Sequence, residues 1–168
     1  LVEIGFGSVD TEKPVILCIG HNVAPGSEII DYARKKGVYG DIEVCALCCT
    51  AHDITRYSNR AKIVGPMSRE IKFVRSGIAD VIVVDEQCIR TDILKEAMKV
   101  ESPLISTSPK AMHGLPDRTE DDADEIVRDL LNGAAGALIL DPEKAGEVAV
   151  RVAVGIFGKR RKARKIID

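Results

Sequence analysis

Short apolar runs, each followed by a segment with helical periodicity, recur along the whole chain and constrain its fold more than any other feature. Continuous apolar runs of strand length are typical of parallel strands that are buried on both faces. The runs occupy residues 14–20, 42–46, 61–64, 80–84, 103–107 and 137–140. The helical segments occupy about residues 27–36, 51–58, 68–77, 91–99, 119–131 and 141–156. This alternation predicts an α/β fold, a doubly wound Rossmann-like parallel sheet of about six strands with helices on both faces.

Several of the predicted helices carry a recognisable start. Ser27 can cap the first helix, and residues 119–122 have the pattern of a capping box. Asp141-Pro142 is a strong helix start, because Asp is a good cap and Pro fits the first turn. We therefore expect the helices to begin at these positions.

The 168 residues suffice for a single domain, which we expect to span 1–168. The chain starts at Leu1 without Met and ends in a basic run, 159–168, that completes no predicted element. We therefore expect a domain excised from a longer subunit, with a basic tail or linker at its end. A net charge of −2 and scarce aromatic residues argue against a nucleic-acid partner. No apolar run is long enough for a membrane span or resembles a signal peptide, so we expect a cytoplasmic protein.

Residues that can hold metals or act as nucleophiles follow the ends of three predicted strands. His21 follows the first strand, Cys48 and Cys49 follow the second, and Cys88 follows the fourth. Because the carboxyl ends of parallel strands lie at one edge of a sheet, we expect these side chains to converge there. An imidazole and two or three thiols form a soft ligand set, which suits iron–sulfur clusters, zinc or nickel rather than magnesium or calcium.

The other cysteines and histidines are expected to be structural. Cys18 and Cys45 lie inside predicted strands and are expected to pack in the core. His52 lies in the helix after the cysteines and is expected to pack or to form hydrogen bonds, whereas His113 lies in a loop and is expected to face solvent. The chain has no G-x-G-x-x-G motif after the first strand, no Walker A motif and no C-x-x-C-x-x-C ferredoxin run.

Three segments carry a specific resemblance to a known family: Gly20-His21-Asn22-Val23-Ala24-Pro25, Cys48-Cys49-Thr50-Ala51-His52-Asp53 and Val84-Asp85-Glu86-Gln87-Cys88-Ile89. In this order, they resemble segments in the central part of the nickel–iron carbon monoxide dehydrogenases. The sequences of these segments most resemble those of the archaeal type, the alpha subunit of the acetyl-CoA decarbonylase/synthase complex. The resemblance runs from about residue 14 to the end of the chain.

The resemblance implies metal ligands for the family's C-cluster, a Ni-4Fe-4S group held by one His and several Cys from two Rossmann-like domains. His21, Cys49 and Cys88 match cluster ligands, and Cys48 matches a cysteine near the cluster that is not a permanent ligand. The implied reaction is the reversible oxidation of carbon monoxide by water to carbon dioxide. Its two electrons leave through iron–sulfur clusters to ferredoxin, and the other partners are the remainder of the subunit and the other subunits of the complex.

The resemblance also shows what this chain lacks. The family's further cluster cysteines, its catalytic lysine and histidine and its electron-transfer clusters have no matching motif here. We therefore expect half of a cluster site and no catalytic residue beyond the cluster ligands. The isolated chain is expected to be inactive and to contain no cluster.

Two other hypotheses remain open at this point. A Rossmann-like module that binds a small ligand or nucleotide, with incidental cysteines, predicts a ligand above the first strand and Cys49 and Cys88 pointing apart. A hybrid-cluster protein, from a related redox family, predicts additional cysteine motifs, and none is present. Half of a cluster site instead predicts His21, Cys49 and Cys88 facing one cavity.

Overall fold

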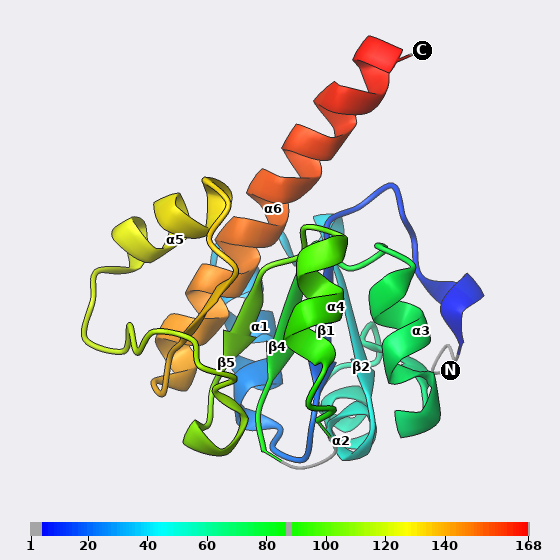
Figure 1. The fold of residues 1–168 in the computed structure, drawn as a ribbon. Helices are drawn as coiled ribbons and strands as arrows, with labels where there is room; N and C mark the ends of the chain where they lie inside the picture. The colour runs from blue at the N-terminus through cyan, green and yellow to red at the C-terminus, as the bar shows by residue number, and fades with distance from the viewer. Residues whose placement is uncertain (1–4, 87–88, 168) are drawn as a thin grey trace.

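A single parallel sheet forms the centre of the molecule (Figure 1). The computed structural model describes residues 5–86 and 89–167, with side chains as far as Arg161. The six strands have the order β3-β2-β1-β4-β5-β6, and every pair is parallel. They are β1 (Val15–Ile19), β2 (Glu43–Leu47), β3 (Lys62–Gly65), β4 (Val81–Val84), β5 (Leu104–Ser106) and β6 (Gly136–Leu138). This order is that of a doubly wound Rossmann-like fold, so the predicted fold class is confirmed.

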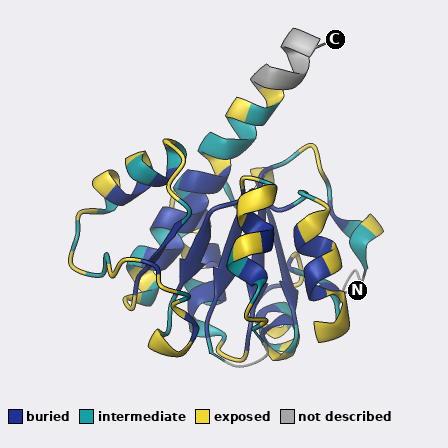
Figure 2. Cartoon of the chain, viewed as in Figure 1, coloured by how far each residue is buried: buried dark blue, intermediate teal, exposed yellow. Residues whose placement is uncertain are grey.

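Helices cover both faces of the sheet, and the strands between them are buried (Figure 2). The helices of one face are α1 (Ala24–Lys35), α2 (Cys49–Tyr57), α5 (Ala123–Leu131) and α6 (Pro142–Ile167). The opposite face is covered by α3 (Glu70–Arg75) and α4 (Ile93–Lys99). Short 3-10 turns lie at η1 (Phe6–Ser8), η2 (Tyr39–Asp41), η3 (Met67–Arg69) and η4 (Pro109–Ala111). Five of the six apolar runs, all but 137–140, therefore contribute to both cores at once, which explains their lack of polar alternation.

The two strand-internal cysteines are core residues, as expected. Cys18 packs in the core under α1 and α6, and Cys45 packs in the core under α3 and α4. Burial, with a smaller contribution from Asp85, raises the pKa of the Cys18 thiol to about 12. Burial likewise raises the pKa of the Cys45 thiol well above its ordinary value. Because the thiolate is the reactive form, neither sulfur is a nucleophile at neutral pH.

Of the three helices with a recognisable start in the sequence, two begin at other residues. Helix α1 begins at Ala24 instead of Ser27, because the side chain of Asn22 accepts a hydrogen bond from the N–H of Ala24 at 3.0 Å. Helix α5 begins at Ala123 instead of Thr119, because the carboxylate of Asp122 caps it. Helix α6 begins at Pro142, as predicted.

The basic segment that follows residue 158 continues helix α6. Figure 1 shows α6 running along the sheet and past its edge. Within this segment, the guanidinium of Arg160 donates hydrogen bonds to the carbonyls of Gly77 at 2.6 Å and Val100 at 3.0 Å. It also lies 3.3 Å from the buried carboxylate of Asp80. Arg160 therefore fixes α6 to the amino edge of the sheet, where the strands begin.

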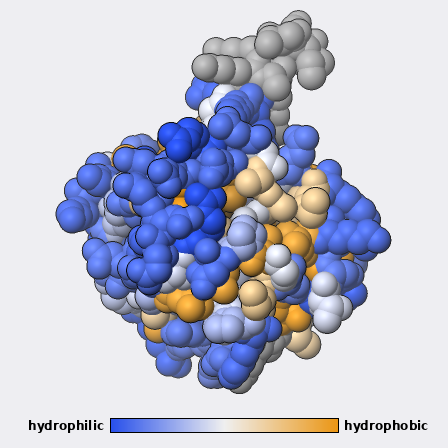
Figure 3. All heavy atoms as spheres, turned by 60° about the vertical axis from the view of Figure 1, so that its left-hand side comes forward, coloured by the Kyte–Doolittle hydropathy of each residue, from blue (hydrophilic) through white to orange (hydrophobic). Residues whose placement is uncertain are grey.

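An open groove of about 600 Å³ lies at this amino edge, between α4, α5 and α6. Met98, Leu130 and Ile156 give it an apolar lining, and Lys159 and Arg160 add positive charge. Figure 3, which brings the α5 side forward, shows a mainly hydrophilic surface with apolar residues gathered in one area. The predicted ligands follow the strand ends at the other edge, so this groove is not part of their site. None of the helices in the described part of the chain is both long and apolar enough to cross a membrane.

Candidate functional site

The candidate site lies at the carboxyl edge, the edge of the sheet at which the parallel strands end. Strand β1 lies between β2 and β4, so the residues after these three strands become neighbours. This is the topological switch point, where doubly wound folds bind their ligands. His21 follows β1 and Cys49 follows β2, and both are exposed to solvent. Cys88, the third predicted ligand, lies outside the described residues.

The backbone after β1 is held by the carboxylate of Asp85, the first residue after β4. One carboxylate oxygen accepts a hydrogen bond from the N–H of His21 at 2.9 Å, and the other accepts one from the N–H of Asn22. Asp85 is 5% exposed, whereas His21 and Asn22 are exposed, so both hydrogen bonds are partly buried. Burial raises the pKa of the Asp85 carboxyl, and the two backbone donors oppose that shift.

Gly20 allows this close approach between the two loops. Its φ of +142° is a conformation that other residues rarely adopt. A Cβ atom at this position would lie 1.6 Å from an oxygen of Asp85. The glycine of the Gly20-His21 pair is therefore required by the Asp85 carboxylate.

Thr50 links the start of α2 to the same loop. Its N–H donates to the carbonyl of Gly20 at 3.0 Å, and its hydroxyl donates to the carbonyl of Asn22 at 3.1 Å. Thr50 is buried, whereas the preceding residue, Cys49, is exposed. The two predicted ligands His21 and Cys49 are thus connected by one hydrogen-bonded junction.

Cys48 has an unusual backbone conformation, with φ +66° and ψ −150°. Residues other than glycine that are held at positive φ occur preferentially at functional sites. The carbonyl of Cys48 accepts a hydrogen bond from the N–H of Ala51 at 3.1 Å, which fits the first turn of α2. This turn directs the chain from β2 into α2 with Cys49 at the first helical position.

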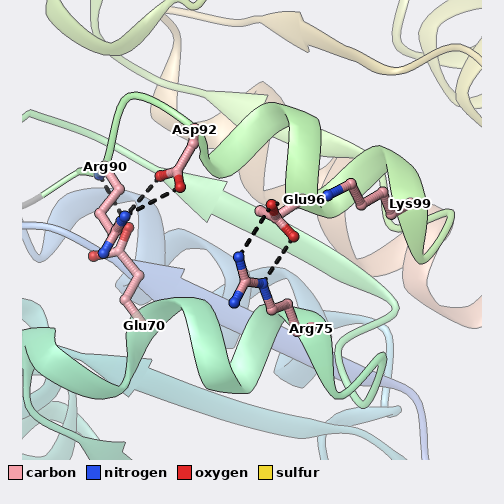
Figure 4. A network of polar contacts seen from close by, with 6 residues as sticks. All are labelled: Glu70, Arg75, Arg90, Asp92, Glu96 and Lys99. Atoms are coloured by element: carbon pink, nitrogen blue, oxygen red, sulfur yellow. Dashed lines mark hydrogen bonds and ion pairs between the residues drawn. The ribbon is translucent and has the colours of Figure 1, made fainter.

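Charged groups surround the loop that follows β4. The Lys110 ammonium lies 2.8 Å from the carboxylate of Glu86 and lowers the pKa of that carboxyl. Beyond residues 87–88, the N–H of Arg90 donates to the buried carboxylate of Glu70 at 3.1 Å (Figure 4). The Arg90 guanidinium pairs with Asp92 at 2.9 Å. The chain is therefore anchored both before and after the segment that contains Cys88.

The network of Figure 4 continues along the helices of this face. Glu96 on α4 accepts hydrogen bonds from Arg75 on α3 at 2.9 and 3.3 Å and from Lys99 at 3.1 Å. The hydrogen bonds from Arg75 and then Lys99 lower the pKa of Glu96 to about 2. This network joins α3 to α4 and thereby supports the loop between β4 and α4.

The other two histidines do not join the site. His52 was expected to pack or to form hydrogen bonds, but it is exposed on α2. His113 was expected to face solvent, but it is half-buried at a φ of +50°, and its Nε2 atom is shielded from solvent. Burial lowers the pKa of the His113 imidazole. The expectation that His113 faces solvent was therefore wrong, because one side of its ring is buried.

The imidazole and thiol groups at the carboxyl edge are of the types that suit a soft metal. Among residues 5–86 and 89–167, no three His, Cys, Asp or Glu side chains lie close enough together to hold a metal ion. An imidazole and thiols at one edge are the ligand types that iron–sulfur clusters and nickel prefer. The arrangement therefore fits a cluster whose other ligands come from elsewhere.

The functional residues that sequence reasoning missed are Asp85, Thr50 and the conformational role of Gly20. The order of the strands makes Asp85 a neighbour of His21, and that order is not visible in the sequence. The available signal in the sequence was the position of Asp85, an acidic residue directly after a strand of β-branched residues.

Fold and site together define the class of this protein as a doubly wound α/β domain with imidazole and thiol groups at its switch point. The model of the Prismane/CO dehydrogenase family matches residues 1–165, so the chain belongs to this family. The resemblance seen in the sequence is thereby confirmed.

Within this family, the chain is similar to curated proteins from archaea that share one name. The chain is 57% identical over 169 residues to the acetyl-CoA decarbonylase/synthase complex subunit alpha of Methanothermobacter thermautotrophicus, covering 100% of this chain and 22% of the relative. It is 55% identical to the subunit of the same name from Methanocaldococcus jannaschii, covering 99% of this chain and 21% of the relative. The chain thus spans about a fifth of the length of these relatives.

Solved structures share the fold. One describes NiZn[Fe4S4] and NiNi[Fe4S4] clusters in the alpha subunits of acetyl-CoA synthase/carbon monoxide dehydrogenase; it has a TM-score of 0.75 at 19% identity and covers 97% of this chain and 23% of that chain. The Ni-free carbon monoxide dehydrogenase of Thermococcus sp. AM4 has a TM-score of 0.70 at 23% identity and covers 97% of this chain and 24% of that chain. At these identities, the likeness supports the fold alone.

Proposed function

We propose that this chain is part of the alpha subunit of an acetyl-CoA decarbonylase/synthase complex and supplies ligands to a Ni-4Fe-4S cluster that interconverts carbon monoxide and carbon dioxide. His21, Cys49 and Cys88 are the proposed ligands, and Cys48 is a nearby thiol that can bind metal transiently. The observation that carries the proposal is the junction of His21 and Cys49 at the switch point of a chain 57% identical to such a subunit.

Two of the chain's own residues would contribute to the metal site, and two of its thiols would not. The imidazole of His21 lies on a loop whose backbone is fixed by Asp85. The thiol of Cys49 is exposed at the start of α2, where a metal can reach it. The buried thiols of Cys18 and Cys45 are not available for coordination. When bound, the cluster would supply the chemistry that turns carbon monoxide and water into carbon dioxide, two protons and two electrons.

The remaining ligands and the electron path belong to other parts of the proposed enzyme. The chain spans about a fifth of its relatives, and its described residues hold no complete metal site. We therefore expect the isolated chain to be inactive and to lack the cluster. Within the whole enzyme, the partners would be the rest of the subunit, the other subunits of the complex and ferredoxin as electron acceptor, in the cytoplasm.

The competing hypothesis, a nucleotide-binding module, requires space for a nucleotide at the switch point. The cavity at the switch point, between Cys18, Asn22 and Asp85, has a volume of only about 10 Å³. Such a volume holds about one water molecule. The Asp85 carboxylate also takes the two loop N–H groups that a phosphate would need. These features favour the cluster ligands over a nucleotide.

The proposal is tested by substitutions in a complete subunit that contains this chain, purified without oxygen. We expect His21→Ala, Cys49→Ser and Cys88→Ser each to lower bound nickel and the carbon monoxide-dependent reduction of a viologen dye by at least about tenfold, since ligands and their supports typically change metal affinity by 10–100-fold. His52→Ala is the matched control, because this exposed imidazole lies one turn away on α2. Full nickel content and activity in the His21 and Cys49 variants would refute the ligand assignment.

A further inference from the structure

Strands β1 and β4 carry a buried aspartate at each end of their pairing, and the two aspartates have different surroundings. Asp80 precedes β4 and accepts the N–H of Val15, where β1 begins, at 2.8 Å. Asp85 follows β4 and accepts the N–H groups of His21 and Asn22, where β1 has ended. Asp80 is 2% exposed and Asp85 is 5% exposed. The strand pair thus contains two carboxylates of similar burial, of which only Asp85 lies beside the proposed ligands.

The Asp85 carboxylate accepts hydrogen bonds from two backbone N–H groups. The two backbone N–H groups belong to consecutive residues, and each meets a different carboxylate oxygen. A carboxylate supplies two acceptors, whereas an amide of the same shape supplies one acceptor and one NH₂ donor. Replacing Asp85 by Asn would therefore bring a donor against a donor in a buried place, which is costly.

The effect of Asp85 extends beyond the His21 loop to the second ligand. The carbonyls of Gly20 and Asn22, on either side of His21, accept the two hydrogen bonds from Thr50. Thr50 directly follows Cys49, so the carboxylate, the loop and the first turn of α2 form one continuous network. The loop packs directly on Asp85, because a Cβ atom at Gly20 would lie only 1.6 Å from its carboxylate.

We propose that Asp85 is a positioning residue for the metal site: its carboxylate holds the backbone of His21 directly and the backbone of Cys49 through Thr50, so that the imidazole and the thiol are aligned before a metal binds. This inference rests on the proposed function, since it takes His21 and Cys49 as ligands. Groups that orient metal ligands typically change metal affinity by 10–100-fold when they are removed.

The test uses Co²⁺ as a spectroscopic probe on the reduced chain without oxygen. Thiolate-to-cobalt charge transfer reports the cysteine ligands, and the visible d–d bands report the coordination geometry. We expect Asp85→Asn to weaken Co²⁺ binding about 10–100-fold and to change the d–d bands. Asp80→Asn is the matched control: it removes a buried carboxylate from the same strand pair and should leave both signals unchanged in the folded protein.

Two further measurements keep the test decisive. Thr50→Val preserves the shape of the side chain but removes its hydrogen bond to Asn22, and we expect about 3–10-fold weaker Co²⁺ binding from the loss of one neutral hydrogen bond. If Asp85→Asn does not fold, Thr50→Val alone tests the positioning role. Wild-type Co²⁺ affinity in Thr50→Val would then overturn the inference. In folded Asp85→Asn, the amides of His21 and Asn22 should exchange with solvent at least tenfold faster than in the wild type, whereas Asp80→Asn should leave them unchanged.

The outcomes separate the inference from the proposed function. Wild-type Co²⁺ affinity in folded Asp85→Asn, with binding still lost in His21→Ala and Cys49→Ser, overturns the positioning role and leaves the ligands in place. A cobalt spectrum that does not change in His21→Ala and Cys49→Ser counts against the proposed ligands. Because the described residues hold no complete metal site, an absence of Co²⁺ binding by the wild-type chain leaves the ligand assignment unaffected. In both cases the amide exchange decides, and unchanged exchange in Asp85→Asn overturns the role of Asp85.

Discussion

Replacing Gly20 by Ala should be among the most damaging single changes in this chain. The backbone at φ +142° would strain an alanine by about 1–3 kcal/mol. The new Cβ would lie 1.6 Å from an oxygen of Asp85, so the carboxylate must move away. Losing its hydrogen bonds to His21 and Asn22 costs about 1.5–3 kcal/mol for each bond to a charged group. The sum is about 4–9 kcal/mol, against a total stability of about 5–15 kcal/mol for a typical domain.

Urea unfolding, followed by circular dichroism, measures this loss against a matched glycine. Gly133 also has a positive φ, +104°, but a Cβ atom there would meet nothing within 4 Å. Gly133→Ala should therefore cost only the backbone strain, about 1–3 kcal/mol. We expect Gly20→Ala to be less stable than Gly133→Ala by at least about 3 kcal/mol, the value of the two lost hydrogen bonds. A difference below about 1 kcal/mol would refute the close packing of Gly20 on Asp85.

Two further predictions concern the polar contacts away from the site. Arg160→Ala should lower the free energy of unfolding by about 2–4 kcal/mol, because it leaves buried Asp80 without this guanidinium, and the exposed Arg161→Ala should change it by less than about 0.5 kcal/mol. Equal effects of the two substitutions in urea unfolding would show that Arg160 does not fix α6. Since the pKa of Glu96 is lowered from 4.5 to about 2, chiefly by Arg75, its stabilisation is present above pH 4.5 and is lost as the pH falls towards 2. Glu96→Gln should lack this acid-sensitive part, so the gap between wild type and variant should shrink over that range; a gap that is constant with pH would argue against the pairing.

The fold was predictable because its signal is repeated along the chain. Five of the six apolar runs contribute to both cores, and buried parallel strands require this continuous pattern. The exact helix starts were less predictable, because several polar residues near each start can act as the cap. Asn22 and Asp122 bond to the first N–H groups of α1 and α5, although Ser27 and Thr119 have equally suitable side chains.

The location of the candidate site at the carboxyl edge was predictable from the sequence, but the contacts that hold its residues were not. That His21 and Cys49 follow parallel strands and lie at one edge of the sheet was inferred from the sequence and is seen in the structure. The role of Asp85 depends on β4 lying beside β1, a pairing between segments 65 residues apart that no local pattern encodes. Arg160 was missed for the same reason, because its partners Gly77 and Val100 lie far away in the sequence.

The measurement that tests the central claim most directly is anomalous scattering at the nickel and iron edges from crystals of a complete subunit that contains this chain. We expect both metals at the carboxyl edge, with the imidazole of His21 and the thiols of Cys49 and Cys88 within coordination distance of them. Nickel and iron bound elsewhere, with these three side chains away from any metal, would contradict the account.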